Sequence, residues 1–148
     1  MIRGNAGEIA ALADVDWQAK GIDAGEGTGD LVAIAQACAQ KLNCVVILPG
    51  PTDVITDGTR VVKVMNGTPL FQVHVGSGDM LSSIVAAFCA VETDYFEAAQ
   101  TACLVFAAIG ERVAQATPNL GAGSFSVQLM DGLQLTTTAQ INAIAVYQ

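Results

Sequence analysis

The sequence predicts an α/β fold of three layers, in which helices cover both faces of a sheet. Helical and strand-like segments alternate over the first half of the 148 residues, and helical segments follow one another after Gly78. Alternating helices and strands are typical of a sheet with helices on both faces. We expect one domain over residues 1–148, because a chain of this length can bury one core and has little room for a second.

The first segments combine the end of a strand with a capped helix. Ile2 and Arg3 fit the tail of a strand, so the chain is expected to begin inside a sheet, truncated at its N-terminus. Asn5 is a good N-cap residue, and Glu8 stands at the third position after it, which is the signature of a capping box for the helix in "NAGEIAALA". A Gly-rich loop at residues 23–30 then leads into a helix whose apolar residues recur at helical spacing: Leu31, Ile34, Ala35 and Cys38.

The middle of the chain has the pattern of short strands. Residues 44–50, "CVVILPG", are an apolar run bounded by Pro and Gly, as expected of a strand buried on both faces. Residues 52–76 predict further strands around turns at Asp57-Gly58 and Asn66-Gly67, because both dipeptides are strong hairpin signals. We expect the last of these strands to end at the glycines after residue 75 and to run directly into a helix.

Helices complete the chain. Residues 80–91 predict a nearly all-apolar helix, which we expect to be buried. Residues 94–116 predict a second helix, capped by Asp94, and residues 124–134 a third. A last helix is expected to begin at about Thr138.

Composition and charge argue against several classes of function. The net charge of −8, with six Lys and Arg, excludes the basic surface on which nucleic-acid binding depends. The apolar runs at 84–91 and 102–109 are shorter than the roughly 18 residues of a membrane span, and no secretory signal is visible at the N-terminus. We therefore expect a cytoplasmic protein whose apolar excess, 52% of residues, covers a core and a subunit interface. Four cysteines without CxxC spacing are expected to be small buried hydrophobes in a reducing compartment: Cys38, Cys44, Cys89 and Cys103.

A glycine loop before the predicted helix of residues 80–91 is the first candidate site. Gly76, Ser77 and Gly78 would aim backbone N–H groups and the positive end of the helix dipole at one point, where anions bind. Asp79 follows at once, where a general base can take a proton from an incoming hydroxyl. The loop is not a P-loop, since no Gly-Lys-Ser/Thr follows, nor a dinucleotide fingerprint. The alternative for Asp79 is simple stabilisation of a helix N-terminus.

Five motifs stand in order along nearly the whole chain: "RGNAGEI" at 3–9, "GID" at 21–23, "NG" at 66–67, "GSGDMLSS" at 76–83 and "GAGSF" at 121–125. Their order and spacing resemble the C-terminal half of the hydroxyethylthiazole kinases, a family of the ribokinase-like superfamily. The resemblance implies a ribokinase-like α/β/α domain that transfers the γ-phosphate of ATP, with Mg²⁺, to the hydroxyl of 4-methyl-5-(2-hydroxyethyl)thiazole in thiamine synthesis and salvage. It also implies a homotrimer with active sites at subunit boundaries.

The resemblance assigns roles to particular residues. Asn5 and Glu8 match the superfamily's NxxE motif, whose acid helps to organise Mg²⁺ and phosphates, and Arg3 matches an arginine that contacts the nucleotide. The loop at 76–78 matches the anion hole for the transferring phosphoryl group. Asp79 stands where the thiazole kinases usually have Cys, and it matches the general base of the wider superfamily.

Departures from the family pattern leave alternatives open. Pro49, in "LPGPTD", stands where the family commonly has a threonine that contacts the nucleotide, and His74 and Val75 replace the usual residues before the anion hole. We interpret His74 as a neighbour of the site and not a catalytic group. Ser124 in "GAGSF" fits either a residue near the site or a helix N-cap. The open alternatives are another ribokinase-superfamily small-molecule kinase, an ATP-dependent hydrate dehydratase, and a non-catalytic half-protein that needs the N-terminal segment of the family.

Overall fold

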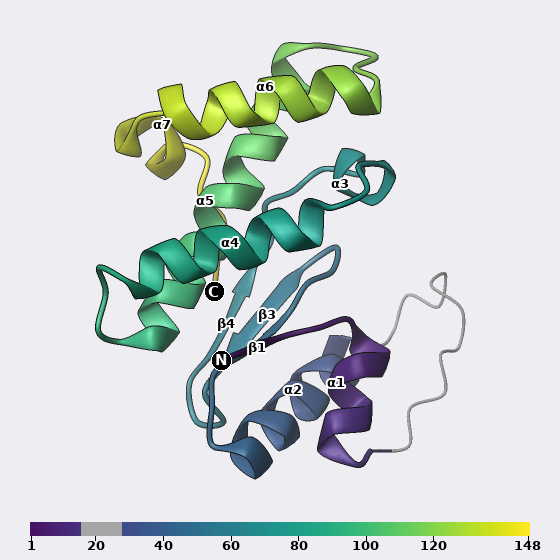
Figure 1. Ribbon diagram of the computed structural model, residues 1–148, viewed down its shortest axis with the longest axis vertical. Helices are drawn as coiled ribbons and strands as arrows, with labels where there is room; N and C mark the ends of the chain where they lie inside the picture. Colours follow the sequence, from purple (N-terminus) through teal and green to yellow (C-terminus); the bar gives the residue numbers. More distant parts are fainter. Residues whose placement is uncertain (16–27) are drawn as a thin grey trace.

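The computed structural model describes residues 1–15 and 28–148. The motif at 21–23 and most of the Gly-rich loop expected at 23–30 lie outside these residues. The elements follow the chain in this order (Figure 1): β1 (Ile2–Arg3), α1 (Ala6–Ala13), α2 (Thr28–Leu42), β2 (Val46–Leu48), β3 (Asp53–Thr56), β4 (Val61–Val64), α3 (Leu70–Val73), α4 (Ser77–Cys89), α5 (Tyr95–Ala116), α6 (Ala122–Leu135) and α7 (Thr138–Asn142).

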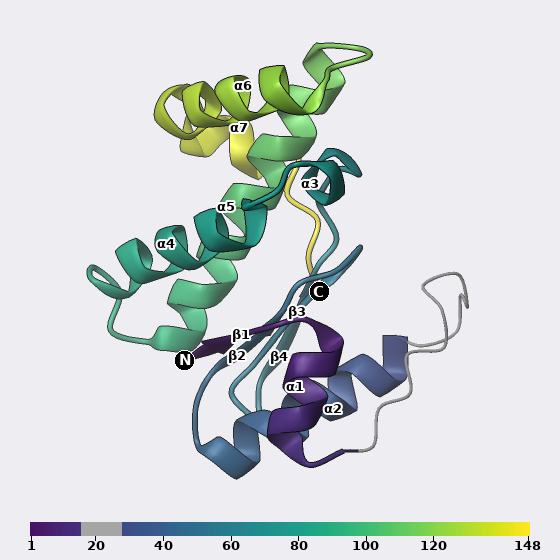
Figure 2. The same cartoon turned by 45° about the vertical axis from the view of Figure 1, so that its right-hand side comes forward.

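The four strands form one mixed sheet in the order β1-β2-β3-β4. β1 pairs with β2 in parallel, whereas β2–β3 and β3–β4 are antiparallel. Helices α1 and α2 lie on one side of the sheet, and α4 and α5 lie on the other (Figures 1 and 2). The predicted α/β/α layering is confirmed.

Strand β2 shows why the sheet is buried on both faces. Val46 and Leu48 pack into the cluster formed with α1 and α2, while Ile47 between them packs into the cluster formed with α4, α5 and α6. Successive side chains of a strand point to opposite faces, so a continuous apolar run serves two cores at once. The prediction made from "CVVILPG" is confirmed, with the strand confined to its central residues.

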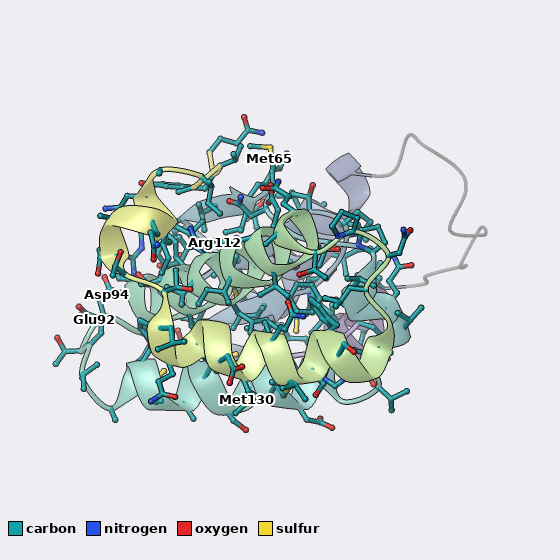
Figure 3. The ribbon with its side chains drawn as sticks, turned by 90° about the horizontal axis from the view of Figure 1, so that it is seen from above. Met65, Glu92, Asp94, Arg112 and Met130 are labelled. Atoms are coloured by element: carbon teal, nitrogen blue, oxygen red, sulfur yellow. The ribbon has the colours of Figure 1, made fainter. Side chains whose placement is uncertain are left out.

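The turn at Asp57-Gly58 is confirmed, and one arginine ties it to the helical layer. Arg60 Nε donates to Asp57 Oδ2 at 2.7 Å, and Arg60 Nη1 donates to Asp94 Oδ2 at 2.6 Å. Asp94 is the N-cap of α5, as predicted, and accepts from Phe96 N at 3.0 Å. Its hydrogen bonds from Arg60 lower the pKa of Asp94 to about 2. Figure 3 labels Asp94 at this end of α5.

The hairpin predicted at Asn66-Gly67 is wrong, because the C-terminal tail occupies the edge of β4. Met65 N donates to Val146 O at 2.9 Å, and Lys63 and Gln148 exchange backbone hydrogen bonds. Asn66, only 5% exposed, donates through Nδ2 to Glu111 Oε2 and to Ile144 O, both at 2.8 Å, and its Oδ1 accepts from Val146 N at 2.7 Å. Gly67 N also donates to Glu111 Oε2, at 3.1 Å.

The strand expected to lead into the glycine loop is also wrong. Residues 70–73 form the short helix α3, and His74 is its C-cap and not a strand residue. The physical reason lies in tertiary packing, since the Phe71 ring stacks at 4.8 Å from the Phe106 ring and meets Phe125 edge-on at 5.4 Å. Aromatic pairs of this geometry stabilise a conformation that the local pattern does not favour.

Two expectations about the C-terminal helices need correction. Helix α4 is amphipathic and not buried as a whole, because only Leu81 and Val85 of its residues are buried. Gly121, and not Ser124, is the N-cap of α6, and Ser124 lies inside the first turn. The starts of α5 and α7 agree with prediction.

All four cysteines are free, with Cys38 and Cys103 buried and Cys44 and Cys89 partly buried. Among the described residues, no helix has the length and apolar character that crossing a membrane requires.

Candidate functional site

The N-terminus of α4 lies beside the end of β1. Gly76 is the N-cap of α4 with φ of 95°, a left-handed conformation that glycine adopts at little cost. Ser77 Oγ donates to the carbonyl oxygen of Phe71 at 3.0 Å, which anchors the loop to α3. Ser77 N already donates to a backbone carbonyl at 3.2 Å. No side chain of the described residues caps α4, so the N–H groups of Gly78 and Asp79 stay available to a ligand. This end of the helix can bind an anion.

Arg3 brings a positive charge to the same place. Its Nε donates to Ser82 Oγ at 2.7 Å, and its Nη1 lies so close to Gly78 that a Cβ on that residue would stand 2.8 Å away. Its Nη2 lies 3.9 Å from Asp79 Oδ1, and the Asp79 side chain is 91% exposed. Gly78 thus leaves room for the guanidinium, which a side chain at this position would displace. The carboxylate of Asp79 faces solvent beside the guanidinium.

The NxxE motif forms the capping box of α1. Glu8 N donates to Asn5 Oδ1 at 3.0 Å, and Asn5 N donates to Glu8 Oε2 at 2.8 Å. Both residues are exposed, and Gly4 lets the chain pass close to the Glu8 side chain, since a Cβ there would stand 3.0 Å from Glu8 Oε2. The capping box predicted from the sequence is confirmed. It uses Glu8 Oε2, and Glu8 Oε1 takes no part in it.

A cavity of about 410 Å³ opens beside the start of α4. It is bounded by the loop after β2, the segment from β4 to α3, the first turns of α4, and α5. Of the residues to which the sequence assigned a role in the site, Pro49, Ser77 and Gly78 line the cavity, while Arg3, Asn5, Glu8, Gly76 and Asp79 do not. The lining residues are Pro49, Gly50, Pro51, Asp53, Met65, Asn66, Gly67, Thr68, Pro69, Phe71, Gln72, Ser77, Gly78, Leu81, Phe106 and Ala107.

Asp53 is a lining residue that sequence reasoning missed. It begins β3, and its Oδ1 accepts from Gly50 N at 3.0 Å, which closes the loop that carries Pro49. Burial raises the pKa of Asp53 to about 6, against an ordinary value of 3.8. Burial also raises the pKa of the neighbouring Cys103 thiol, and the Asp53 charge adds to that rise. The acid that follows "LPGPT" is the sequence signal that could have pointed to Asp53. Thr-Asp in that position is equally typical of a turn, so the signal does not distinguish a site residue from a turn residue.

Asp53→Asn is expected to make stability less dependent on pH. The folded-state pKa lies above the unfolded value, so Asp53 stabilises the fold only at low pH, and this contribution is lost as the pH rises from about 4 through about 6. A difference of about two pKa units between the folded and unfolded states corresponds to about 3 kcal/mol in the free energy of unfolding. Urea unfolding at pH 4 and pH 7.5 should show that the variant becomes more stable relative to the original chain at the higher pH, because asparagine stays uncharged where the buried Asp53 ionises. Asparagine also keeps an acceptor for Gly50 N. A stability difference that is constant with pH would contradict the raised pKa.

The geometry and the motifs together fit a known group of proteins. Residues 1–138 match the model of the hydroxyethylthiazole kinase family. The chain belongs to this family.

Curated hydroxyethylthiazole kinases are similar over nearly the whole chain. The protein of that name from Levilactobacillus brevis is 82% identical over all 148 residues, which cover 56% of its own length. The one from Lactiplantibacillus plantarum is 67% identical over 146 residues, 98% of this chain and 56% of that protein. The solved structure of the hydroxyethylthiazole kinase protein from Pyrococcus horikoshii OT3 matches with a TM-score of 0.84 at 27% identity, covering 99% of this chain and 53% of that one. The chain therefore spans about half the length of the hydroxyethylthiazole kinases it matches.

The two residues that depart from the hydroxyethylthiazole kinase pattern before the glycine loop lie away from the cavity lining. Val75 is 95% exposed. His74 Nε2 lies 3.4 Å from Met80 Sδ, and its ring centre lies 6.1 Å from that of Phe125. These contacts fit a packing neighbour of the loop.

Proposed function

We propose that this chain carries the phosphoryl-transfer site of a thiazole kinase. The reaction moves the γ-phosphate of ATP to the hydroxyl of 4-methyl-5-(2-hydroxyethyl)thiazole in thiamine synthesis and salvage. The observation that carries the proposal is the meeting of Arg3, Gly78 and Asp79 at the uncapped start of α4. The names of the relatives support the choice of the thiazole alcohol as acceptor.

Each part of the site has a task in this reaction. The backbone N–H groups of Gly76 and Gly78, which have no partner among the described residues, form the anion hole that stabilises charge on the transferring phosphoryl group. Arg3 pairs with phosphate oxygens through its terminal nitrogens. Asp79, whose carboxylate is exposed at the first turn of α4, takes the proton of the attacking hydroxyl as general base. The cavity lined by Pro49 holds the nucleotide.

The residues present fit a magnesium ion that is held chiefly by phosphates. No three His, Cys, Asp or Glu side chains cluster in the described part of the chain. Mg²⁺ typically takes one or two carboxylates together with water and phosphate oxygens. Glu8 is the candidate ligand, because its Oε1 is outside the capping box and Asn5 holds its orientation. When bound, the ion neutralises charge on the phosphates.

Glu8→Gln is expected to raise the Mg²⁺ concentration that gives half-maximal ADP release by about 10–100-fold. Glutamine at the third helical position keeps the capping box, so α1 should remain folded. ADP release measured over a range of MgCl₂, with circular dichroism as the folding control, checks this result. An unchanged Mg²⁺ dependence would contradict the metal role.

Gly78→Ala is expected to weaken ATP binding about tenfold without loss of stability. The new Cβ would stand 2.8 Å from Arg3 Nη1, so the guanidinium must move and part of its charged hydrogen bonding is lost. Alanine itself favours a helix by up to about 1 kcal/mol over glycine. Gly123→Ala is the matched control, because Gly123 is also the second residue of a helix and no atom lies within 4 Å of its Cβ position. Calorimetric titration with ATP should separate the two variants, and equal affinities would argue against this placement of Arg3.

Thiazole-dependent ADP release from ATP and Mg²⁺ tests the proposed function directly. Release by the 148-residue chain would mean that it assembles a complete site. We propose that it does so as a homotrimer with sites between subunits, to be checked by light scattering. Activity with other hydroxylated heterocycles, and none with the thiazole, would favour the related kinases or dehydratases.

A second candidate function is that of an incomplete half-protein. The observation in its favour is that the chain spans about half the length of its relatives. It predicts no ADP release by the chain alone and recovery of release when the chain is mixed with residues that correspond to the first half of the Levilactobacillus brevis protein.

A further inference from the structure

We infer that Ser82 positions the Arg3 guanidinium at the anion-hole loop and thereby sets how tightly the chain holds nucleotide phosphates; the affinity part of this inference rests on the proposed function. Ser82 lies in the second turn of α4. Its Oγ accepts from Arg3 Nε at 2.7 Å and donates to Gly78 O at 3.1 Å. A hydroxyl has one donor and two acceptor sites, so both bonds are made together.

The bond through Nε decides which edge of the guanidinium is free. Arginine has five N–H donors in a rigid planar fork. Within the described residues, Arg3 makes its side-chain hydrogen bond through Nε. Nη1 and Nη2 are then held beside Gly78 and Asp79, at 2.8 Å from the Gly78 Cβ position and 3.9 Å from Asp79 Oδ1. Two terminal nitrogens held side by side match the paired oxygens of a phosphate.

Pre-organisation is the benefit of this arrangement. An arginine side chain loses conformational entropy when it binds a ligand. If a neighbour already fixes the side chain in the free protein, less entropy is lost on binding. Ser82 fixes Arg3 to the same helix whose first N–H groups would bind the phosphate. The arginine and the anion hole are therefore held in one relative position before the ligand arrives.

The neighbouring Ser83 offers a matched control within the same helix. Its Oγ donates to Asp79 O at 3.0 Å, as Ser82 Oγ donates to Gly78 O. Ser83 is exposed, however, and accepts no hydrogen bond from an arginine of the described residues. Both serines thus make the same bond to the carbonyl four residues earlier. Only Ser82 adds the bond from Arg3.

Titration of the 148-residue chain with Mg²⁺ and ATP tests the affinity part. Ser82→Ala is expected to raise the Kd about tenfold, the effect of one charged hydrogen bond, and Ser83→Ala to change it less than twofold. In an Arg3→Ala background, Ser82→Ala should add no further loss, because its action passes through Arg3. Equal losses in both backgrounds, or no loss in either, would overturn the inference.

The Arg3 side-chain N–H signal in a nitrogen-15 NMR spectrum gives a reading that needs no nucleotide. We expect the Nε–H of Arg3 to exchange slowly with water in the original chain and in Ser83→Ala, and quickly in Ser82→Ala. A signal unaffected by Ser82→Ala would overturn the positioning role. If the original chain shows slow exchange of the Arg3 Nε–H but does not bind ATP, the proposed function and the affinity part are contradicted. The positioning of Arg3 by Ser82 would stand in that case.

Discussion

Asp79→Asn is expected to lower thiazole-dependent ADP release by about 10²–10⁴-fold, the usual loss when a general base is removed. Asparagine has nearly the same shape but cannot accept a proton at neutral pH. The side chain is 91% exposed and its nearest cation, Arg3 Nη2, is 3.9 Å away, so the fold should not depend on it. Initial rates with saturating ATP, measured beside thermal unfolding, check both parts of this expectation.

Glu97→Gln provides the control for this experiment. Glu97 is an acid in the first turn of α5, as Asp79 is in the first turn of α4. Both acids stabilise the positive end of a helix dipole. Turnover that falls in Asp79→Asn and persists in Glu97→Gln would separate proton transfer from helix stabilisation. Full turnover in Asp79→Asn would show that the base is another group.

Phe125→Ala is expected to destabilise the fold by about 3–5 kcal/mol, which is typical of a buried phenylalanine replaced by alanine. Phe125 is fully buried and meets the Phe71 ring edge-on at 5.4 Å. The carbonyl of Phe71 accepts the Ser77 hydroxyl bond that anchors the glycine loop. The cavity left by the ring should therefore loosen α3 and the loop together.

Urea unfolding measures the stability part of this prediction. Val127→Ala, on the same helix at a residue 63% exposed, is the control and should change stability by less than about 0.5 kcal/mol. Phe125→Leu should recover much of the loss by filling the space. A loss below about 1 kcal/mol in Phe125→Ala would mean that the ring does not support α3.

Local signals in the sequence were sufficient for much of the fold. Asn5 and Asp94 cap helices because their short polar side chains reach backbone N–H groups within three residues, and such bonds depend on neighbours in the chain alone. The apolar run that contains β2 is similarly readable, since a strand between two helical layers has no polar face. These elements determine the layers.

Other features depend on contacts between distant residues. Residues 70–75 alternate like a strand, yet the rings of Phe106 and Phe125 stabilise a helix there. Within the candidate site, the anion-hole loop could be found from its glycines, but the bond from Arg3 to Ser82 joins residues 79 positions apart. No local pattern marks such a pair.

The hydrogen bonds around Asn66 also bear on the chemical ageing of the chain. In flexible peptides, Asn-Gly loses ammonia readily, because the unhindered glycine nitrogen attacks the side-chain amide. Here Gly67 N donates to Glu111 Oε2, and both ends of the Asn66 amide are engaged. Folding thus protects Asn66 from attack by the Gly67 nitrogen on its side-chain amide, and unfolding removes this protection. The product would carry a carboxylate beside that of Glu111, so a chain that has spent long periods unfolded acquires a charge repulsion that opposes its return to the native state.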